Sequence, residues 1–298
     1  MANTQCLNSI PAIGALCGQA SPLQKAAGLF LALPDFEFAT FTDAVNQTKW
    51  LEAIRDEKIF PVLDLDDEET KDAEDNETTT ATGKTIFNFE GTRGRIYKVT
   101  LPVSVHQKLR DYSFQKLRLF ILDKGNNIMG TSPDGVKLKG LKTSYFRIQK
   151  QNWEGFVTNI QVNFGDVNEW DKFGKYFNPS WNGSDLEALT SVSLTCGTVN
   201  QSTNVLTAVV AYVDNAELTE AGAEKSVPIS GLVAANFAFI KHGTTTVWTP
   251  ETVVETATPG TYTITCHTPN VYDYGTAQVV PSTTALYKSD VETTTAAT

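Results

Sequence analysis

The sequence is poor in the side chains that usually build metal centres and hydrolytic active sites. Of its 298 residues, three are histidine and four are cysteine, and no two cysteines have the CxxC spacing of a zinc or redox site. The signatures of phosphate-binding loops, zinc proteases, dinucleotide-binding folds and serine hydrolases are missing as well. We therefore expect a protein that is not an enzyme, with no catalytic residues, no cofactor and no metal ion.

Positive charge and long hydrophobic runs are also scarce. The 24 basic residues face 34 acidic ones, and the net charge of -10 opposes binding to nucleic-acid phosphates or to anionic lipid. The most continuous apolar stretch, residues 26–33, is much shorter than the roughly 20 residues of a membrane-spanning helix. The first basic residue is Lys25, so the start of the sequence lacks the positive segment of a secretory signal. We expect a protein that is made and used without export and has no membrane partner.

The composition is globular, 41% hydrophobic and 19% charged, and it divides the chain into four regions. Residues 1–34 are punctuated by proline and glycine and predict an extended arm that needs a neighbour to order it. Residues 35–184 predict a β-rich domain with an acidic loop at 64–77. The composition then shifts to Thr, Val and Ala, and 185–288 predict the short strands of an all-β sandwich. Residues 289–298 are too polar to pack and predict a flexible tail.

Several segments of the 35–184 region alternate apolar and polar residues, which is typical of half-buried strands. The predicted strand segments are 35–41, 85–91, 95–105, the hairpin 117–132, 143–149 and 156–164. Short helices are expected after a cap at Thr42 or Asp43 and around His106. Residues 166–177 fit either a helix capped by Asp166 or a loop. The chain is therefore predicted to be mainly β.

The 64–77 segment is a run of acidic residues in which only Lys71 is basic. Its acidic members are Asp64, Asp66, Asp67, Glu68, Glu69, Asp72, Glu74, Asp75 and Glu77. Like charges this close repel one another, which predicts a solvated, mobile loop. The run lacks the glycine that a calcium loop needs for its sharp turn, so we expect no structural calcium site. A segment this negative also repels DNA, and it would suit the wall of a conduit through which DNA slides.

Two cysteines on predicted strands admit two interpretations. Cys196 and Cys266 have Trp248 between them, an order that superficially copies the disulfide-stapled immunoglobulin pattern. The tryptophan, however, lies much nearer the second cysteine. Because the sequence shows no secretory signal, we favour two reduced thiols over a disulfide.

The histidines also have a functional and an ordinary interpretation. His106, close to Arg110 and Asp111, could be a general base with its orienting partner, but we favour an ordinary surface helix. His242 and His267 fall on predicted strands without an acidic cluster near them, which makes a weak metal-ligand pair.

Residues 227–266 resemble the bacterial immunoglobulin-like modules of invasins and phage appendages. Those modules carry a P-V-x-G-L-x-x-x-D/N-F stretch followed by a P-G-T-Y-T corner. The matching residues here are Pro228, Gly231, Leu232, Asn236, Phe237, Pro259, Gly260, Thr261, Tyr262 and Thr263. The resemblance implies an immunoglobulin-like β-sandwich over 185–288. It says little about function, because such modules occur on adhesins and virions alike.

The layout of the preceding region is similar to that of phage major tail proteins, whose β-barrel cores form stacked rings and often carry an appended immunoglobulin-like domain. The shared features are an N-terminal arm, a long acidic loop, paired strands and the LFILDKGNNIMGTSPDG hairpin. This resemblance implies a virion structural protein made in the bacterial host cytoplasm, foremost a tail tube subunit. Its partners would be copies of itself, other virion proteins and DNA in transient passage. The alternatives are a capsid decoration or head-to-tail adaptor protein, and a bacterial surface adhesin or carbohydrate-binding module.

In such a ring, the arm at 1–34 and the segment 60–84 would order on contact with adjacent subunits. The acidic run would line the lumen, stay solvated, or contact basic residues of a neighbouring subunit. We favour the last interpretation, because a long flexible run is well placed to reach a neighbour. The basic residues expected in this contact are Arg93, Arg95, Lys108 and Arg110.

Overall fold

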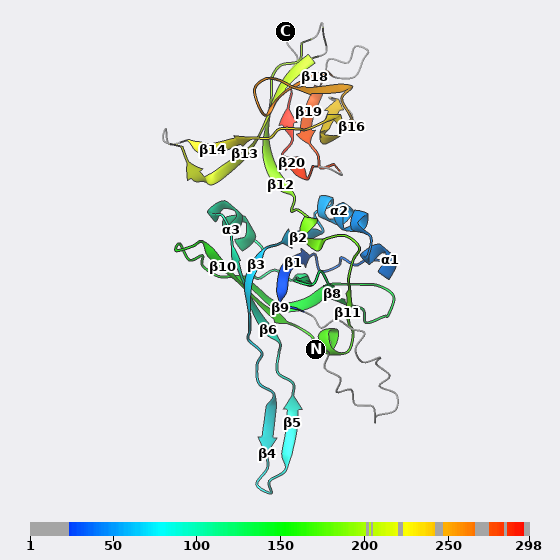
Figure 1. Ribbon diagram of the computed structural model, residues 1–298, viewed down its shortest axis with the longest axis vertical. Helices are drawn as coiled ribbons and strands as arrows, with labels where there is room; N and C mark the ends of the chain where they lie inside the picture. The colour runs from blue at the N-terminus through cyan, green and yellow to red at the C-terminus, as the bar shows by residue number, and fades with distance from the viewer. Residues whose placement is uncertain are drawn as a thin grey trace.

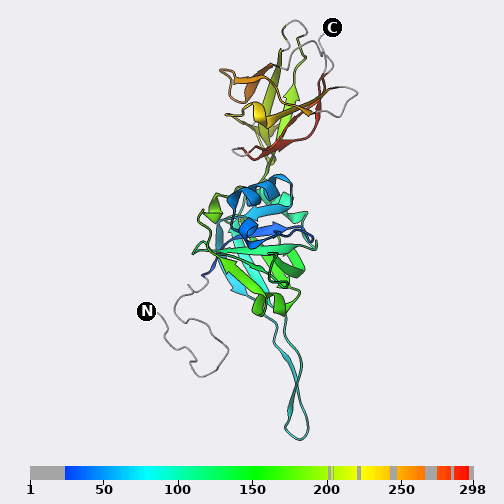
Figure 2. The same cartoon turned by 90° about the vertical axis from the view of Figure 1, so that its right-hand side faces the viewer.

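The computed structural model describes residues 24–294, apart from 201–202, 204, 220–222, 242–246, 266–273 and 283–284. The chain is mainly β, with 46% strand and 13% helix, which confirms the fold class expected from the alternating segments. Figures 1 and 2 show two β-rich units stacked along the long axis of the molecule. A two-stranded hairpin projects from the first unit at the end away from the second.

The first unit is built on one antiparallel sheet that curls into a half-barrel. Its strands are β1 (Ala26–Ala32), β2 (Ile59–Val62), β3 (Leu65–Thr70), β6 (Gly94–Thr100), β7 (Arg118–Asp123), β8 (Ile128–Thr131), β9 (Leu141–Ile148), β10 (Val157–Phe164) and β11 (Gly174–Phe177). β7 pairs with β1 on one side and with β8 and β9 on the other, and the path continues through β10 and β6 to β3. β2 and β3 are consecutive in the chain, yet β2 pairs with β1 and β3 with β6. The chain itself therefore links the two ends of the curl.

Strand β1 corrects the prediction of an extended arm over 1–34, as far as that segment is described. Leu29 and Leu31 face the inside of the curl, whereas Phe30 and Ala32 face a second cluster on the outside. All four are completely buried. A strand buried on both faces shows no period-two alternation, so a continuous apolar run was mistaken for loop pieces. Residues 1–23 lie outside the described residues.

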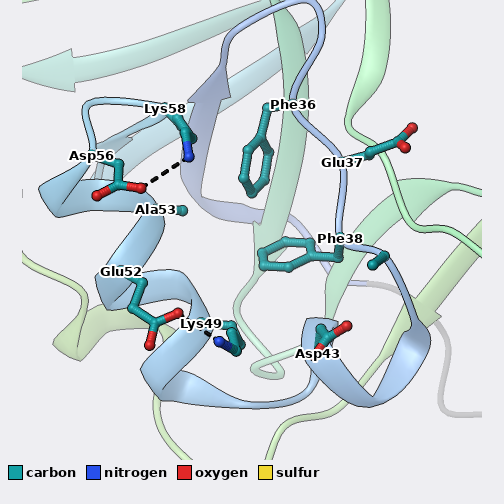
Figure 3. Close-up of a pocket in the computed structure, with 10 residues that line it drawn as sticks. Phe36, Glu37, Phe38, Asp43, Lys49, Glu52, Ala53, Asp56 and Lys58 are labelled. Carbon is teal, nitrogen blue, oxygen red and sulfur yellow. Dashed lines mark hydrogen bonds and ion pairs between the residues drawn. The ribbon is translucent and has the colours of Figure 1, made fainter.

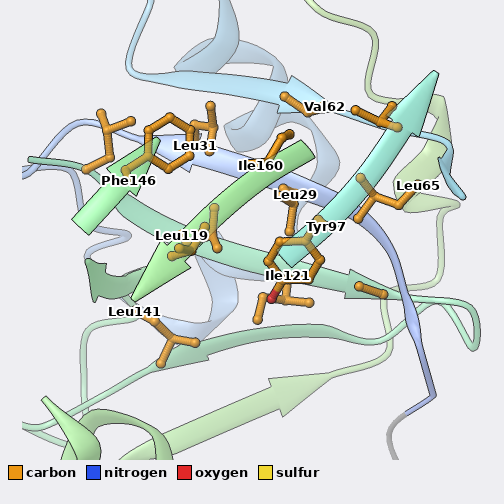
Figure 4. Close-up of a cluster of buried hydrophobic side chains, with 14 of the residues drawn as sticks. Leu29, Leu31, Val62, Leu65, Tyr97, Leu119, Ile121, Leu141, Phe146 and Ile160 are labelled. Carbon is orange, nitrogen blue, oxygen red and sulfur yellow. The ribbon is translucent and has the colours of Figure 1, made fainter. Parts of the chain in front are cut away.

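Two hydrophobic clusters hold the first unit together, one on each face of the sheet. Figure 4 shows the inner cluster, in which Tyr97, Phe146 and Ile160 converge from three strands. The outer cluster packs Phe120 against Trp50, whose indole Nε1 donates a hydrogen bond of 2.7 Å to the Ala44 carbonyl. The covering helices are α1 (Phe41–Ala44) and α2 (Gln47–Arg55). Each such side chain stabilises the fold by about 1.5–3 kcal/mol on burial.

The segment 35–41 is a loop with one isolated bridge rather than the expected strand. The rings of Phe36 and Phe38 pack edge to face with centroids 5.0 Å apart. The alternation of these two phenylalanines thus reflects ring packing and not a pleated strand. The helix caps also differ from Thr42 or Asp43, because Thr40 caps α1 and Asn46 caps α2.

The remaining predicted elements of the first unit are largely confirmed. β7 and β8 form the hairpin expected at 117–132, and β9 and β10 match their predicted segments. The strand predicted over 95–105 is too long, because β6 ends at Thr100 and α3 (Val103–Arg110) follows. α4 (Val167–Asp171) is capped by Asp166, which decides for a helix there.

The second unit consists of two sheets that share one core. One sheet contains β12 (Thr190–Cys196), β13 (Val205–Leu218), β14 (Glu224–Pro228), β17 (Thr252–Glu255), β18 (Thr261–Thr265) and β20 (Tyr287–Ser289). The other contains β15 (Phe237–Lys241), β16 (Val247–Trp248), β19 (Tyr274–Val279) and β21 (Glu292–Thr293). Val210 and Ile264 from the first sheet are buried in one cluster with Phe237 and Val279 from the second. The 3-10 turns η1 (Gly183–Asp185) and η2 (Ala234–Asn236) precede β12 and β15.

The end of the chain corrects the prediction of a flexible tail over 289–298. β20 pairs in parallel with β12, and β21 pairs with β19. Ser289 and Thr294 are both buried, and the Ser289 hydroxyl accepts a hydrogen bond of 2.8 Å from the Val279 amide. Polar residues pack here because the strand partners satisfy their backbone groups. Residues 295–298 lie outside the described residues.

The two units touch at a junction near residue 188. Leu286 of the second unit packs against the outer cluster of the first, in which Leu186 is fully buried. Lys288 Nζ lies 2.6 Å from a Glu57 carboxylate oxygen. The described strands up to Phe177 pair only with one another, and so do those from Thr190 onward. Independent folding on either side of 184/185 stays a prediction.

Candidate assembly surfaces

The first half of the acidic run is not a solvated loop, because Leu65–Thr70 pair as β3 with the basic strand β6, whereas residues 71–75 are irregular and exposed. The antiparallel register places Asp67 opposite Lys98. Lys98 forms an ion pair with Glu69, and Lys25 Nζ lies 3.0 Å from Asp67. The expectation of a self-repelling loop counted the charges along the chain. The cations that offset them stand on strand β6 and at the start of β1, next to the run in space.

These contacts shift the titration of the groups involved. The hydrogen bond from Lys98 holds the pKa of Glu69 below its usual value, and the hydrogen bond from Lys25 lowers the pKa of Asp67. The hydrogen bond to Glu69 raises the pKa of Lys98 in turn. All three groups therefore stay charged across the neutral range, and the ion pairs persist there.

Arg95 joins the acidic strand to the end of the inner cluster. Its Nε lies 3.2 Å from Glu68 and its Nη1 lies 2.5 Å from Asp72. The guanidinium also lies over the Trp170 ring, 5.6 Å from the centroid. With a side chain only 11% exposed, Arg95 is a structural residue of the first unit.

Arg93 also packs against Trp170. Its guanidinium lies 5.4 Å from the Trp170 centroid, and its Nη2 contacts Asp171 at 2.5 Å. Arg93 and Arg95 were expected to bind the acidic run of a neighbouring subunit. Both are engaged within the chain, and their contact with a neighbouring subunit stays a prediction.

Other members of the acidic run have separate places. Asp66 accepts a hydrogen bond of 2.9 Å from the Thr100 hydroxyl, and Asp75 accepts one of 2.7 Å from the Gly91 amide. Asp64 bends the chain between β2 and β3 with φ 57°. Glu74 and Glu77 are exposed.

Lys108 and Arg110 lie on α3 and do not approach the acidic run. Lys108 Nζ lies 5.7 Å from the centroid of the Tyr212 ring of the second unit. Arg110 is exposed near the end of the helix. Of the four predicted basic residues, Arg95 therefore lies at the acidic strand, Arg93 at Trp170 and Asp171, and Lys108 at the junction of the units.

The projecting hairpin consists of β4 (Asn76–Thr79) and β5 (Thr85–Phe89), which form a sheet of their own. Its register places Phe87 opposite Glu77 and Ile86 opposite Thr78. Ile86 is 45% exposed and Phe87 is 55% exposed. The alternation over 85–91 predicted the strand β5 correctly, but not that both neighbours would stand in solvent. The signal available in the sequence was that the apolar residues of β5 follow a strand, β4, that contains only polar residues.

A cleft of about 530 Å³ opens between the two units. Its wall on the first unit includes Phe60 and Tyr112, with ring centroids 4.9 Å apart, and Val105 of α3. Its wall on the second unit includes Leu189 and Tyr212. No sequence pattern indicated this cleft, because its two walls come from segments that are distant in the chain.

A smaller cavity of about 270 Å³ lies beside α2, as Figure 3 shows. Phe36 and Phe38 form one side, and paired charges surround it. The pairs are Asp56 with Lys58 at 2.9 Å and Lys49 with Glu52 at 2.7 Å. Each of these four charges therefore has an ion-pair partner at the cavity.

His106 faces inward from α3 instead of standing on the surface. Its Nδ1 lies 3.0 Å from the Thr158 hydroxyl, and burial lowers the pKa of its imidazole, with Arg110 adding to the effect. The ring is therefore neutral and part of the packing. His242, His267 and Cys266 lie outside the described residues, and the thiol expectation for Cys196 and Cys266 stays a prediction.

The described residues contain neither a cluster of potential metal ligands nor a membrane-spanning helix. Within them, no group of three or more His, Cys, Asp or Glu side chains could hold a metal ion. None of the helices formed by these residues is long and apolar enough to cross a membrane.

Comparison with known proteins adds no relative. No family model matches the sequence, and no curated protein matches it.

Proposed function

We propose that the chain is a structural protein of a phage virion, a tail tube subunit that assembles into stacked rings. The observation that carries the proposal is the hairpin β4–β5. A two-stranded hairpin without a third strand or a covering helix is at best marginally stable in water. This one also holds Ile86 and Phe87 in solvent, far from either core. Such an arm is stabilised when a neighbouring subunit covers it.

The architecture of the first unit supports a ring-forming body. The half-barrel sheet has its own inner core, and the helices α1 and α2 cover one outer face. The curl leaves β11 at an end of the sheet path, where a second chain could continue the ladder. The proposed tail-tube-like barrel corresponds to this curled sheet, completed by contacts between subunits.

The second unit supports the proposal of an appended immunoglobulin-like sandwich. The buried Tyr262 donates a hydrogen bond of 2.5 Å to the Ile229 carbonyl and accepts one of 3.3 Å from the Leu232 amide. It thus connects the two stretches on which the resemblance depends, including Gly231 with φ 80°. A tyrosine that bonds back to an upstream backbone segment is also found in immunoglobulin-like folds.

The role of the acidic run changes within this proposal. Its carboxylates at 67–72 are mostly balanced by Lys25, Arg95 and Lys98 in the same chain. They are therefore poorly suited to recruit a neighbour. If the tube conducts DNA, the net charge of -10 on each subunit, and not the acidic run alone, would repel the DNA and disfavour its retention.

Negative-stain microscopy of the purified full-length protein at rising concentration tests the proposal. We expect rings or tubes, and we expect the double change Ile86→Ser with Phe87→Ser to abolish them. Val136→Ser is the matched control, because Val136 is equally exposed at 57% but lies outside the hairpin. Monomers at every concentration would contradict the proposal. Binding only to preformed capsids would identify a decoration protein instead.

A further inference from the structure

We propose that the hairpin β4–β5 of one copy docks its Phe87 face into the cleft between the two units of a second copy. This inference rests on the proposed function and names the partner surface for its arm. The occupant is thus a second copy of this chain. Within one copy the contact cannot form, because the cleft is lined by residues of both units, whereas the hairpin projects from the end of the first unit away from the second.

The hairpin has two distinguishable faces. Adjacent residues of a strand point to opposite sides, so Phe87 and Ile86 cannot enter the same pocket together. Phe87 shares its face with Glu77, its cross-strand partner, and Ile86 shares the other face with Thr78. One face therefore offers an aromatic ring beside a carboxylate, and the other offers an aliphatic side chain beside a hydroxyl.

The cleft matches the Phe87 face in chemistry. Phe60, Tyr112, Val105 and Leu189 give it apolar and aromatic walls. Its volume of about 530 Å³ falls within the range of roughly 300–1,000 Å³ in which pockets bury a whole small ligand, so a phenyl ring fits with room for rearrangement. Aromatic pairs at such contacts add about 0.5–1.5 kcal/mol beyond the area they bury.

The charges at the mouth of the cleft also match. Lys108 is exposed there, and its ammonium group lies over Tyr212. The other charged residue of the lining, Glu57, is already paired with Lys288. A docked Phe87 would bring Glu77 to the same mouth, where Lys108 would meet it. Beside Ile86 the other face places Thr78, which offers Lys108 no carboxylate.

The contact joins two different surfaces, so it is heterologous. Each copy that docks its hairpin into a neighbour leaves its own cleft open for the next, and the contact can repeat into a ring or an open filament. An occupied cleft also touches both units, so docking would fix the position of the second unit relative to the first.

Site-specific photo-crosslinking tests the docking. A benzoylphenylalanine side chain replaces Phe87 in one sample and Ile86 in a matched control, and the crosslinked peptides are mapped by mass spectrometry. We expect crosslinks from position 87 between copies, to residues 57–63, 101–112, 188–191 or 212. We expect position 86 to give none there. Multimers whose position-87 crosslinks fall elsewhere would overturn this inference and leave the proposed function standing. A chain that forms no multimers would overturn both.

A charge exchange gives a second readout. Glu77→Lys and Lys108→Glu should each raise the concentration needed for assembly by about fivefold or more, since like charges then face each other. The double variant should restore assembly, which loss of folding could not explain. Two defects that add without rescue would overturn the pairing. Phe87→Ser should raise the assembly concentration about tenfold or more, and Ile86→Ser should raise it less.

Discussion

The ribbon that runs from β3 through β4 and β5 to β6 has two halves with the same antiparallel pairing and opposite surroundings. The half formed by β3 and β6 belongs to the curled sheet and places Leu65 and Val99 in the inner cluster. The half formed by β4 and β5 belongs to no larger sheet. Two of its apolar side chains, Ile86 and Phe87, are exposed to solvent. Backbone pairing alone thus does not decide where a strand is stable.

The difference lies in what each half packs against. The inner half has a hydrophobic face and ion pairs across the strands, and each opposite-charge pair on neighbouring strands contributes about 0.2–1 kcal/mol. Among the described residues, no side chain of the outer half belongs to a buried hydrophobic cluster. A partner that covers the outer half would therefore stabilise it, whereas the inner half is already stabilised by packing and ion pairs within the chain.

The largest contrast should appear between Phe120→Ala and Phe87→Ala. Phe120 is fully buried against Trp50, and its loss should cost about 3–5 kcal/mol in the free energy of unfolding. Phe87 is 55% exposed, and its loss should change that free energy by less than about 0.5 kcal/mol in the monomer. Urea denaturation at low protein concentration measures both. A large cost for Phe87→Ala would mean that the hairpin is packed within one chain.

The next largest effect concerns the root of the ribbon, where Arg95 meets Glu68, Asp72 and Trp170. Arg95→Ala should cost about 3 kcal/mol, because it leaves partly buried carboxylates without their cation. Arg95→Lys should recover only part, since an ammonium group cannot reproduce the planar stacking or the two-sided contact. Lys84→Ala at the exposed tip is the control and should be neutral. Equal denaturation midpoints for Arg95→Ala and Lys84→Ala would contradict the structural role of Arg95.

This contrast explains what could be predicted from the sequence. The β7–β8 hairpin and strands β9 and β10 were predictable because turn residues and alternation are local signals. Strand β3 was not predictable, because its stability depends on cations that are distant in the sequence. Lys98, which pairs with Glu69, follows it by 29 positions, and Arg95, which pairs with Glu68, follows it by 27. A charge run looks solvated until its partner strand is known.

The candidate surfaces were predictable only in part. The acidic run and Arg95 do come together, but within one chain, and Arg93 pairs with Asp171 instead. The periodicity of a sequence does not distinguish a contact within one chain from a contact between two copies. The cleft required the fold, because Tyr112 and Leu189 meet only after both units are placed. At β1 the sequence predicted an extended arm where the structure has a buried strand. Phe30 and Leu31 are buried on different faces of the sheet, so the strand shows no alternation of apolar and polar residues.

A smaller effect should be the pH dependence of the inner half, which contains the ion pair between Glu69 and Lys98. The pKa of Glu69 lies below its ordinary 4.5 in the folded chain, so its pairing with Lys98 is complete above pH 4.5 and is lost as the pH falls through the lower folded value. The pKa of Lys98 is raised above 10.5, so the same pair is lost at the alkaline end as the pH rises through that higher value. Carboxyl NMR titration should show the Glu69 pKa moving back toward 4.5 in Lys98→Met. Lys84→Met should leave it unchanged, and an equal shift in both would contradict the pairing.

The smallest effect on global stability should come from Gly91→Ala, at the joint between the halves. A Cβ atom at Gly91 would lie 1.9 Å from the Ala73 carbonyl oxygen, so the two strands of the ribbon must separate there. The joint buries little apolar surface, and we expect the free energy of unfolding to change by less than about 1 kcal/mol. The base of the hairpin would nevertheless be held less firmly, because the hydrogen bond from the Gly91 amide to Asp75 would be lost.

Hydrogen exchange should therefore accelerate in residues 76–89 and remain unchanged in 94–100, because regions open with their own local free energies. Glu90→Ala, one residue away and exposed, is the control. Acceleration across both halves together would show that the ribbon opens as one unit, and that the contrast between its halves is not energetic.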